Sequence, residues 1–240
     1  MRADLLDAQA AVDWAVAQLP TMQKRVIVWR RDKPHSTRID AKTEPGKKLY
    51  RFTEIKPLPA IIHAEAGAII HSIRSSLDIL ACTLAARHRR DESRSTYFPI
   101  WKTEADFLNP KSRVLEKIER LSDVDQGIIK DLRPYPGGND TLCTLHELDL
   151  TRKHRRLLNT LVAPRGVFLD GVGNVDITVY ECGFDEEAVI ASTAADVPDG
   201  NLRASLEVTL DEGYLTAGSN FSAPIGEFAR TATAIIRLFD

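Results

Sequence analysis

Apolar and polar positions along the 240-residue chain follow a helical period in the first two thirds and a strand period in the last third. The strongest helical signal covers residues 59–89, where apolar residues recur every three or four positions and form one continuous ridge. Glu65, Ser72, Ser76 and Thr83 lie roughly opposite that ridge, so we expect them to face water. The ridge consists of Ile62, Ala66, Ile69, Ile70, Ile73, Leu77, Leu80 and Leu84.

A second long helix is predicted over residues 141–162. Its leucines are distributed around most of the helix circumference, which indicates a central position in the fold. The loop 133–140 (RPYPGGND) precedes it, and Asp140 or Thr141 is expected to cap its first turn.

The N-terminal region combines a helix with a small antiparallel sheet. Residues 3–19 show helical spacing, and Pro20 is expected to end that helix. Runs of β-branched and aromatic residues at 25–29, 38–40 and 48–52, with a turn at 44–46, predict short strands that include a β-hairpin.

The C-terminal region alternates apolar and polar residues with period two. Segments 167–169, 175–180, 188–190 and 202–210 predict a four-stranded antiparallel β-meander, and Pro224 opens a terminal helix. The fold class is therefore α+β: a helical core with an N-terminal β-hairpin and a C-terminal meander closed by a helix. We expect two parts, residues 1–162 and 163–240, packed as one unit.

Composition places the chain among ordinary globular proteins, with 43% hydrophobic and 28% charged residues. No uninterrupted apolar run reaches the roughly 18 residues that span a bilayer, and the N-terminal 19 residues do not resemble a signal peptide. Three widely spaced cysteines, Cys82, Cys143 and Cys182, argue against a disulfide framework. These features predict a cytoplasmic protein without membrane association, and no motif implies a cofactor.

Charge is distributed unevenly along the chain. Residues 1–162 contain 28 Lys and Arg against 21 Asp and Glu, whereas residues 163–240 contain 4 against 13. A basic surface of this kind can serve an anionic partner such as nucleic acid. Alternatively, the two parts attract each other within the fold or across a homodimer, and the sequence leaves both interpretations open.

The best candidate for a functional site is a pair of polar arcs beside the apolar ridges. On the first helix this arc contains His63, Gly67, His71, Arg74 and Asp78. On the second it contains His146, Asp149, Lys153 and Arg156. Charged groups next to a core are costly unless they pair with each other or with a ligand, so the place where the two arcs would meet is the best candidate for a site. The sequence alone does not establish that the two arcs face each other. Gly67 lacks a side chain, which allows another group to approach the helix backbone closely.

These helices also carry a resemblance to known proteins. The segments Ile73-Arg-Ser-Ser-Leu-Asp78, Tyr97-Phe-Pro-Ile100 and Leu145-His-Glu-Leu148, followed by Lys153-His-Arg155, resemble a group of uncharacterised bacterial proteins. The resemblance covers about residues 50–160 and implies a shared helical core without an assigned activity. An arginine and a histidine across a helical core are also distantly similar to the HEPN nucleases. The HEPN signature, Arg followed after four to six residues by His, is matched only by Arg30 and His35, which lie in the predicted sheet region.

Three functions fit the polar arcs. In the first, Arg74, His71 and His146 cleave RNA without a metal, since imidazole can transfer protons and guanidinium can stabilise a phosphorane. In that hypothesis Asp78, Asp149, Lys153 and Arg156 bind the substrate, and the basic run 152–156 contacts phosphates.

In the second hypothesis a metal ion is bound by His71, Asp78, His146 and Asp149. Arg74 and Lys153 lie in the same arcs and would repel a cation. In the third the chain is a non-enzymatic interaction module, in which the Arg74–Asp78 and Asp149–Lys153 pairs are structural. Cys143 and His146 form a further nucleophile pair by spacing, and we interpret Cys143 as a packing residue.

Overall fold

The computed structural model describes residues 1–32, 35–88, 95–158, 160–170, 176–179, 189–210 and 222–240. Contacts divide the chain into two compact units. The first comprises residues 1–22, 64–158 and 222–240, and the second comprises residues 23–63 and 159–221. This division differs from the expected parts 1–162 and 163–240, because the C-terminal helix packs with the helical unit and the N-terminal hairpin pairs with a C-terminal strand.

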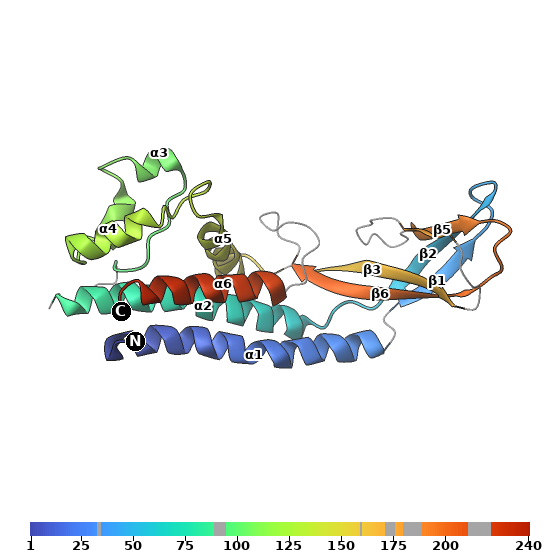
Figure 1. Cartoon of the computed structure of the whole chain (residues 1–240), viewed down its shortest axis with the longest axis horizontal. Coiled ribbons are helices and arrows are strands. Elements are labelled where there is room, and N and C mark those ends of the chain that lie inside the picture. The colour runs from blue at the N-terminus through green and yellow to red at the C-terminus, as the bar shows by residue number, and fades with distance from the viewer. Residues whose placement is uncertain (33–34, 89–94, 159, 171–175, 180–188, 211–221) are drawn as a thin grey trace. The chain divides into compact units, whose positions relative to one another are not determined.

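The first unit is helical, and α1, α2 and α6 run lengthwise beside one another in it (Figure 1). Residues 23–31 of α1 and 60–63 of α2 belong to the second unit. The helices are α1 (Leu6–Arg31), α2 (Ala60–Arg87), α3 (Glu104–Phe107), α4 (Asp123–Asp131), α5 (Asp140–His154) and α6 (Ser222–Arg237). Two 3-10 turns, η1 (Ala3–Leu5) and η2 (Arg113–Lys117), complete the unit.

Helix α2 provides the centre of the helical core. Every residue of its predicted apolar ridge is at most 2% exposed, which confirms that part of the sequence analysis. The opposite side is partly covered: the expectation that it faces water is wrong for Ser76, which is buried, while Glu65, Ser72 and Thr83 are half-buried. Ser76 is fully buried and its hydroxyl donates to the Ile73 carbonyl, whereas Ser72 donates to the Ala11 carbonyl of α1. Helix α1 thus covers the face of α2 that the sequence marks as polar.

Helix α1 does not end at Pro20, as the sequence predicted. It continues to Arg31, and residues 25–29 are helical and not a strand. Its buried positions recur every three, four or seven residues on both sides of the proline, so continued burial outweighs the backbone hydrogen bond that Pro20 cannot donate. Those positions are Leu5, Ala8, Val12, Ala15, Met22, Val26 and Trp29.

Helix α5 is shorter than predicted. The side chain of its N-cap residue Asn139 accepts a hydrogen bond from the Leu142 amide, and the helix ends at His154 and not at residue 162. Basic residues fill its last turn, where they interact favourably with the helix dipole. Residues 160–162 instead begin a strand, and their β-branched residues Thr160 and Val162 are of the types that strands favour. The terminal helix α6 buries the predicted residues Ile225, Phe228, Ala232, Ile235 and Ile236.

The second unit contains two antiparallel sheets. The predicted hairpin is present as β1 (His35–Asp40) and β2 (Lys47–Ile55), with Tyr50 opposite Ile39. Strand β5 (Val189–Ala194) pairs with β2 and with β4 (Thr178–Val179), which gives the order β1-β2-β5-β4. Strands β3 (Thr160–Asp170) and β6 (Asn201–Leu210) form a separate pair. The α+β class is confirmed, but the C-terminal strands do not follow one another as a simple meander.

The uneven charge of the sequence is balanced largely within the second unit. Its N-terminal segment, residues 23–63, carries 11 basic and 4 acidic residues, and its C-terminal segment, 159–221, carries 2 and 11. Pairing of β2 with β5 brings these segments together, and the Lys48 ammonium lies 2.7 Å from the Asp199 carboxylate. The first unit carries 19 of each sign. The oppositely charged segments that cause most of the asymmetry along the sequence therefore belong to the same unit.

Among the described residues, one helix is long and apolar enough to cross a bilayer by length and composition alone. That helix is α2, and 56% of its most apolar stretch is buried inside the protein. Burial of this kind is typical of the core helix of a soluble protein.

Candidate functional site

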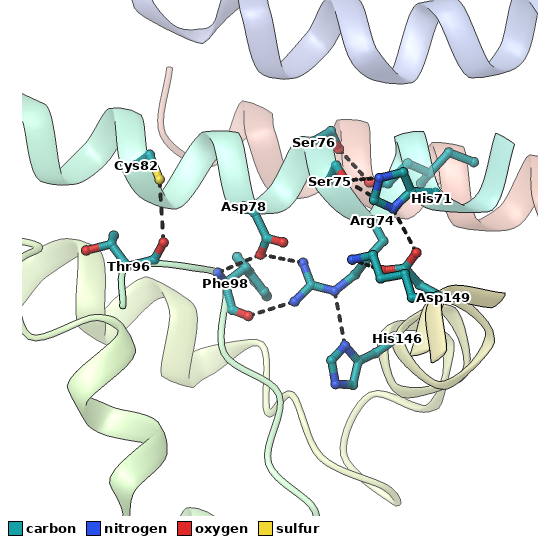
Figure 2. Close-up of polar contacts among 12 residues, drawn as sticks. His71, Arg74, Ser75, Ser76, Asp78, Cys82, Thr96, Phe98, His146 and Asp149 are labelled. Atoms are coloured by element: carbon teal, nitrogen blue, oxygen red, sulfur yellow. Dashed lines mark hydrogen bonds and ion pairs between the residues drawn. The ribbon is translucent and has the colours of Figure 1, made fainter. Parts of the chain in front are cut away.

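The two polar arcs predicted from the sequence meet in the first unit, where α2 lies against α5 (Figure 2). The Nε–H of Arg74 on α2 donates to Nδ1 of His146 on α5 at 3.3 Å. The Nδ1 of His71 on α2 lies 2.9 Å from Oδ1 of Asp149 on α5. These two contacts bring His71, Arg74, His146 and Asp149 together, and we call these four residues the polar cluster. The sequence placed each residue on its helix but left open whether the two arcs meet.

Arg74 occupies the centre of this cluster and is only 4% exposed. Each of its three guanidinium nitrogens has a partner within the protein. Besides the Nε contact, one terminal nitrogen donates to Oδ1 of Asp78 at 2.7 Å and the other to the carbonyl oxygen of Phe98 at 2.9 Å. The buried positive charge is thereby paired and hydrogen-bonded, as burial requires.

Arg74 and Asp78 together hold the backbone of Phe98. Oδ1 of Asp78 accepts from the Phe98 amide at 3.0 Å, while Arg74 donates to the carbonyl of the same residue. One turn further along α2, the Cys82 thiol contacts the Thr96 carbonyl at 3.5 Å (Figure 2). Positions 74, 78 and 82 lie on one helix face, so they fix the segment around Phe98 along α2. The Phe98 side chain itself is fully buried.

A second group of contacts surrounds Asp149, whose side chain is 2% exposed. Its Oδ1 faces His71 at 2.9 Å, and its Oδ2 lies 2.6 Å from Nζ of Lys153, one turn along α5. The buried carboxylate therefore has both oxygens engaged. His71 and Lys153 remain about one third exposed, so this group borders solvent.

Ser75 completes a serine–histidine–aspartate set by residue type, but its geometry does not fit nucleophilic catalysis. Its Oγ lies 3.4 Å from both ring nitrogens of His71. A base that accepts the serine proton needs Oγ within about 3.2 Å of one nitrogen and along its lone pair. Equal distances to Nδ1 and Nε2 place the hydroxyl away from both lone-pair directions, so His71 and Asp149 do not activate Ser75.

His146 is a neutral acceptor in this arrangement. Burial lowers its pKa to about 4, and the positive charges of Arg74 and Lys117 act in the same direction. Because Nδ1 accepts from Arg74, the single ring proton resides on Nε2. Nδ1 is consequently not available to accept a proton from a substrate.

Lys117 on η2 is a neighbour of this site that the sequence analysis missed. Burial lowers its pKa, and the Arg74 charge lowers it further. Its ammonium lies 5.0 Å from the centroid of the Tyr97 ring. No motif marks Lys117, because η2 is a short turn without helical periodicity and its approach to Arg74 depends on tertiary packing alone.

The close approach predicted at Gly67 is confirmed. A Cβ atom at this position would lie 2.7 Å from Cγ of Arg152, so the aliphatic part of the Arg152 side chain covers the α2 backbone at this point. Arg152 belongs to the basic run 152–156, whose residues were predicted to contact phosphates. At least this residue serves helix packing with its side-chain stem.

Arg156 does not join the site as predicted. It follows the end of α5, is exposed, and donates to the carbonyl of Leu157 at 3.2 Å. The helical projection that placed it in the arc fails because α5 ends at His154. Cys143 also lacks the properties of a nucleophile, since burial, aided by Asp140 and Glu147, raises the pKa of its thiol to about 11.

Both aspartates that were considered as metal ligands have cationic partners. Asp78 pairs with Arg74 and Asp149 pairs with Lys153. Within the part of the chain that the structure describes, no group of three or more His, Cys, Asp or Glu residues is arranged to hold a metal ion. The arrangement instead provides one ion pair within α2 and one within α5, and the contacts of Arg74 with His146 and of His71 with Asp149 connect the two helices.

Comparison with known protein families, with curated proteins and with solved structures found no match to this chain. The site therefore has to be interpreted from its own geometry.

Replacement of Gly67 by alanine tests the contact with Arg152. Alanine favours a helix over glycine by about 1 kcal/mol, but the new Cβ collides with Cγ of Arg152. We expect Gly67→Ala to lower the free energy of unfolding in urea by about 1 kcal/mol. In an Arg152→Ala background the same change should instead stabilise the protein.

Gly127→Ala on α4 is the matched control, because no atom lies within 4 Å of the Cβ position there. This control should gain up to about 1 kcal/mol. Stabilisation of the wild-type background by Gly67→Ala would contradict the close contact.

The lowered pKa of His146 predicts a pH-dependent stability. Between its ordinary pKa of 6.5 and the value of about 4 in the folded protein, the unfolded chain binds a proton that the folded chain does not. The contribution of the neutral His146 to the free energy of unfolding is fully present above pH 6.5 and is lost as the pH falls toward 4. It amounts to about 3 kcal/mol, because one pKa unit corresponds to about 1.4 kcal/mol.

Urea unfolding of wild type and His146→Gln at pH 7 and pH 4.5 measures this contribution. We expect the wild type to lose more stability than the variant between the two pH values. An equal loss in both proteins would show that the His146 ring titrates normally.

Proposed function

We propose that this chain is a non-enzymatic interaction module, in which the polar contacts between α2 and α5 hold the helical unit together. The observation that carries the proposal is that the Arg74 guanidinium is buried and fully hydrogen-bonded within the protein. The guanidinium is 4% exposed, and all three nitrogens contact protein acceptors, namely His146, Asp78 and the Phe98 carbonyl. A substrate would have to displace these acceptors before it could use the charge.

The chemistry of the other candidate residues supports the same proposal. Catalysis of RNA cleavage by a histidine pair requires pKa values near the working pH, so that the ring can both accept and donate a proton. His146 has a pKa of about 4 and its Nδ1 is engaged by Arg74. Asp149 is engaged by both His71 and Lys153. These pairings are what a structural network requires.

One observation favours nucleic acid as a ligand. Lys153, His154, Arg155 and Arg156 are exposed beyond or at the end of α5, and such a run can contact phosphates. The equal numbers of acidic and basic residues in the first unit weaken this alternative. Metal-independent RNA cleavage stays a prediction, which the following experiment tests together with the structural proposal.

Arg74→Ala should destabilise the protein without changing any activity toward RNA. The substitution leaves Asp78, the Phe98 carbonyl and His146 without their common donor, and we expect the free energy of unfolding to fall by on the order of 3 kcal/mol. Arg74→Lys should recover only part of this loss, because an ammonium cannot reproduce the planar fork of three contacts. Urea unfolding and incubation with mixed single-stranded and structured RNA in EDTA provide the two readouts.

Arg113→Ala is the matched control, since Arg113 is an exposed arginine on η2. It should change neither readout. The proposal is wrong if wild type cleaves RNA in EDTA and Arg74→Ala abolishes cleavage while the unfolding free energy stays at the wild-type value. That result would assign Arg74 to catalysis.

A further inference from the structure

An open groove runs between α1 and α6 on the first unit, away from the polar cluster. Its volume is about 610 Å³, and apolar side chains dominate its walls. The two helices are antiparallel, because Gln9 near the start of α1 contacts Thr233 in the second half of α6 and the Arg2 amide contacts Asp240. The α1 wall includes Val12, Val16 and Leu19, and the α6 wall includes Gly226, Ala229 and Ala234.

The walls of the groove suit close packing against a second pair of helices. Small residues line its α6 wall, which permits close approach of another backbone. On the α1 wall the Val16 side chain is 44% exposed. Apolar side chains of this size remain in contact with water unless another surface covers them.

The charges on the groove identify its occupant. Asp13 lies on the α1 wall, whereas Arg230 and Arg237 lie on the α6 wall. Gln9 holds the Asp13 carboxylate at 2.8 Å, and Glu227 contacts Arg230 from the preceding turn. Opposite charges on opposite walls do not favour a ligand of one sign. These charges instead complement a surface that places a basic wall opposite the acidic α1 wall and an acidic wall opposite the basic α6 wall.

A second copy of this chain, related by a two-fold axis, has that reversed order. In such an isologous interface, residue i of one copy contacts residue j of the other, and j contacts i in return. Because Gln9 lies level with Thr233, Asp13 of each copy then faces Arg230 on the α6 wall of its partner. We propose that the protein forms a two-fold homodimer in which the α1–α6 grooves of two copies face each other as a four-helix arrangement.

This dimer goes beyond the proposed function and does not depend on it, because none of its residues belongs to the polar cluster between α2 and α5. Asp13→Arg and Arg230→Asp are the variants that test it. Each reversal alone places like charges across the two-fold axis, whereas the double variant restores opposite charges with their positions exchanged.

Sedimentation velocity over a concentration series of the full chain measures the dimer dissociation constant. We expect a dimer for the wild type at about 100 µM, a dissociation constant raised at least tenfold in Asp13→Arg, and recovery of most of that loss in the double variant. Val16→Glu should be monomeric. Asp131→Arg on α4, an exposed charge reversal outside the groove, should behave as wild type.

Urea unfolding of each variant checks that the monomer remains folded. A monomeric wild type at about 100 µM overturns the proposal, and so does a dimer that Asp13→Arg and Val16→Glu leave unchanged. Titration with dodecanoate tests whether an apolar small molecule binds the groove instead. Saturable binding to a monomeric wild type that is lost in Val16→Glu would assign the groove to such a ligand and overturn the homodimer.

Discussion

Burial of the Arg74 guanidinium is the constraint on which the helical unit depends. A positive charge that is 4% exposed has lost most of its hydration, and it is tolerated only because three acceptors surround it. These acceptors come from different parts of the chain: Asp78 from α2, His146 from α5, and the Phe98 carbonyl from the segment between them. One side chain thereby requires the three segments to take fixed positions relative to one another.

The neighbouring groups follow from this requirement. Because Asp78 also accepts from the Phe98 amide, the polar backbone of a buried residue is satisfied without a strand or a helix. His146 must remain neutral beside a fixed cation, which accounts for the direction of its pKa shift together with burial. Asp149, one turn further along α5, is a buried anion that His71 and Lys153 neutralise. The contact between α2 and α5 thus contains a buried cation, Arg74, paired with Asp78, and a buried anion, Asp149, paired with Lys153.

The helical half of this arrangement could be predicted from the sequence, and the reasons are local. The ridge from Ile62 to Leu84 and the residues of each polar arc depend only on the geometry of a single helix. The contact of Arg74 with His146 depends on how α2 packs against α5, which the sequence left open. Other features depend on partners distant in sequence. Ser72 donates to the Ala11 carbonyl of α1, and Lys117 and the Phe98 backbone reach Arg74 through packing that no periodicity records. Pro20 was read as the end of a helix because local propensity opposed helix continuation, whereas buried residues on both sides support it.

The central claim is that His146 is held neutral as an acceptor for buried Arg74. The most direct measurement is ¹⁵N NMR of the histidine side chains, with the resonance of His146 assigned by comparison with His146→Gln. The structure predicts a neutral ring at pH 6 with an unprotonated Nδ1 and a proton on Nε2. A ring that is protonated at both nitrogens near pH 6, or that carries its proton on Nδ1, would show that Arg74 does not donate to His146 and would contradict the claim.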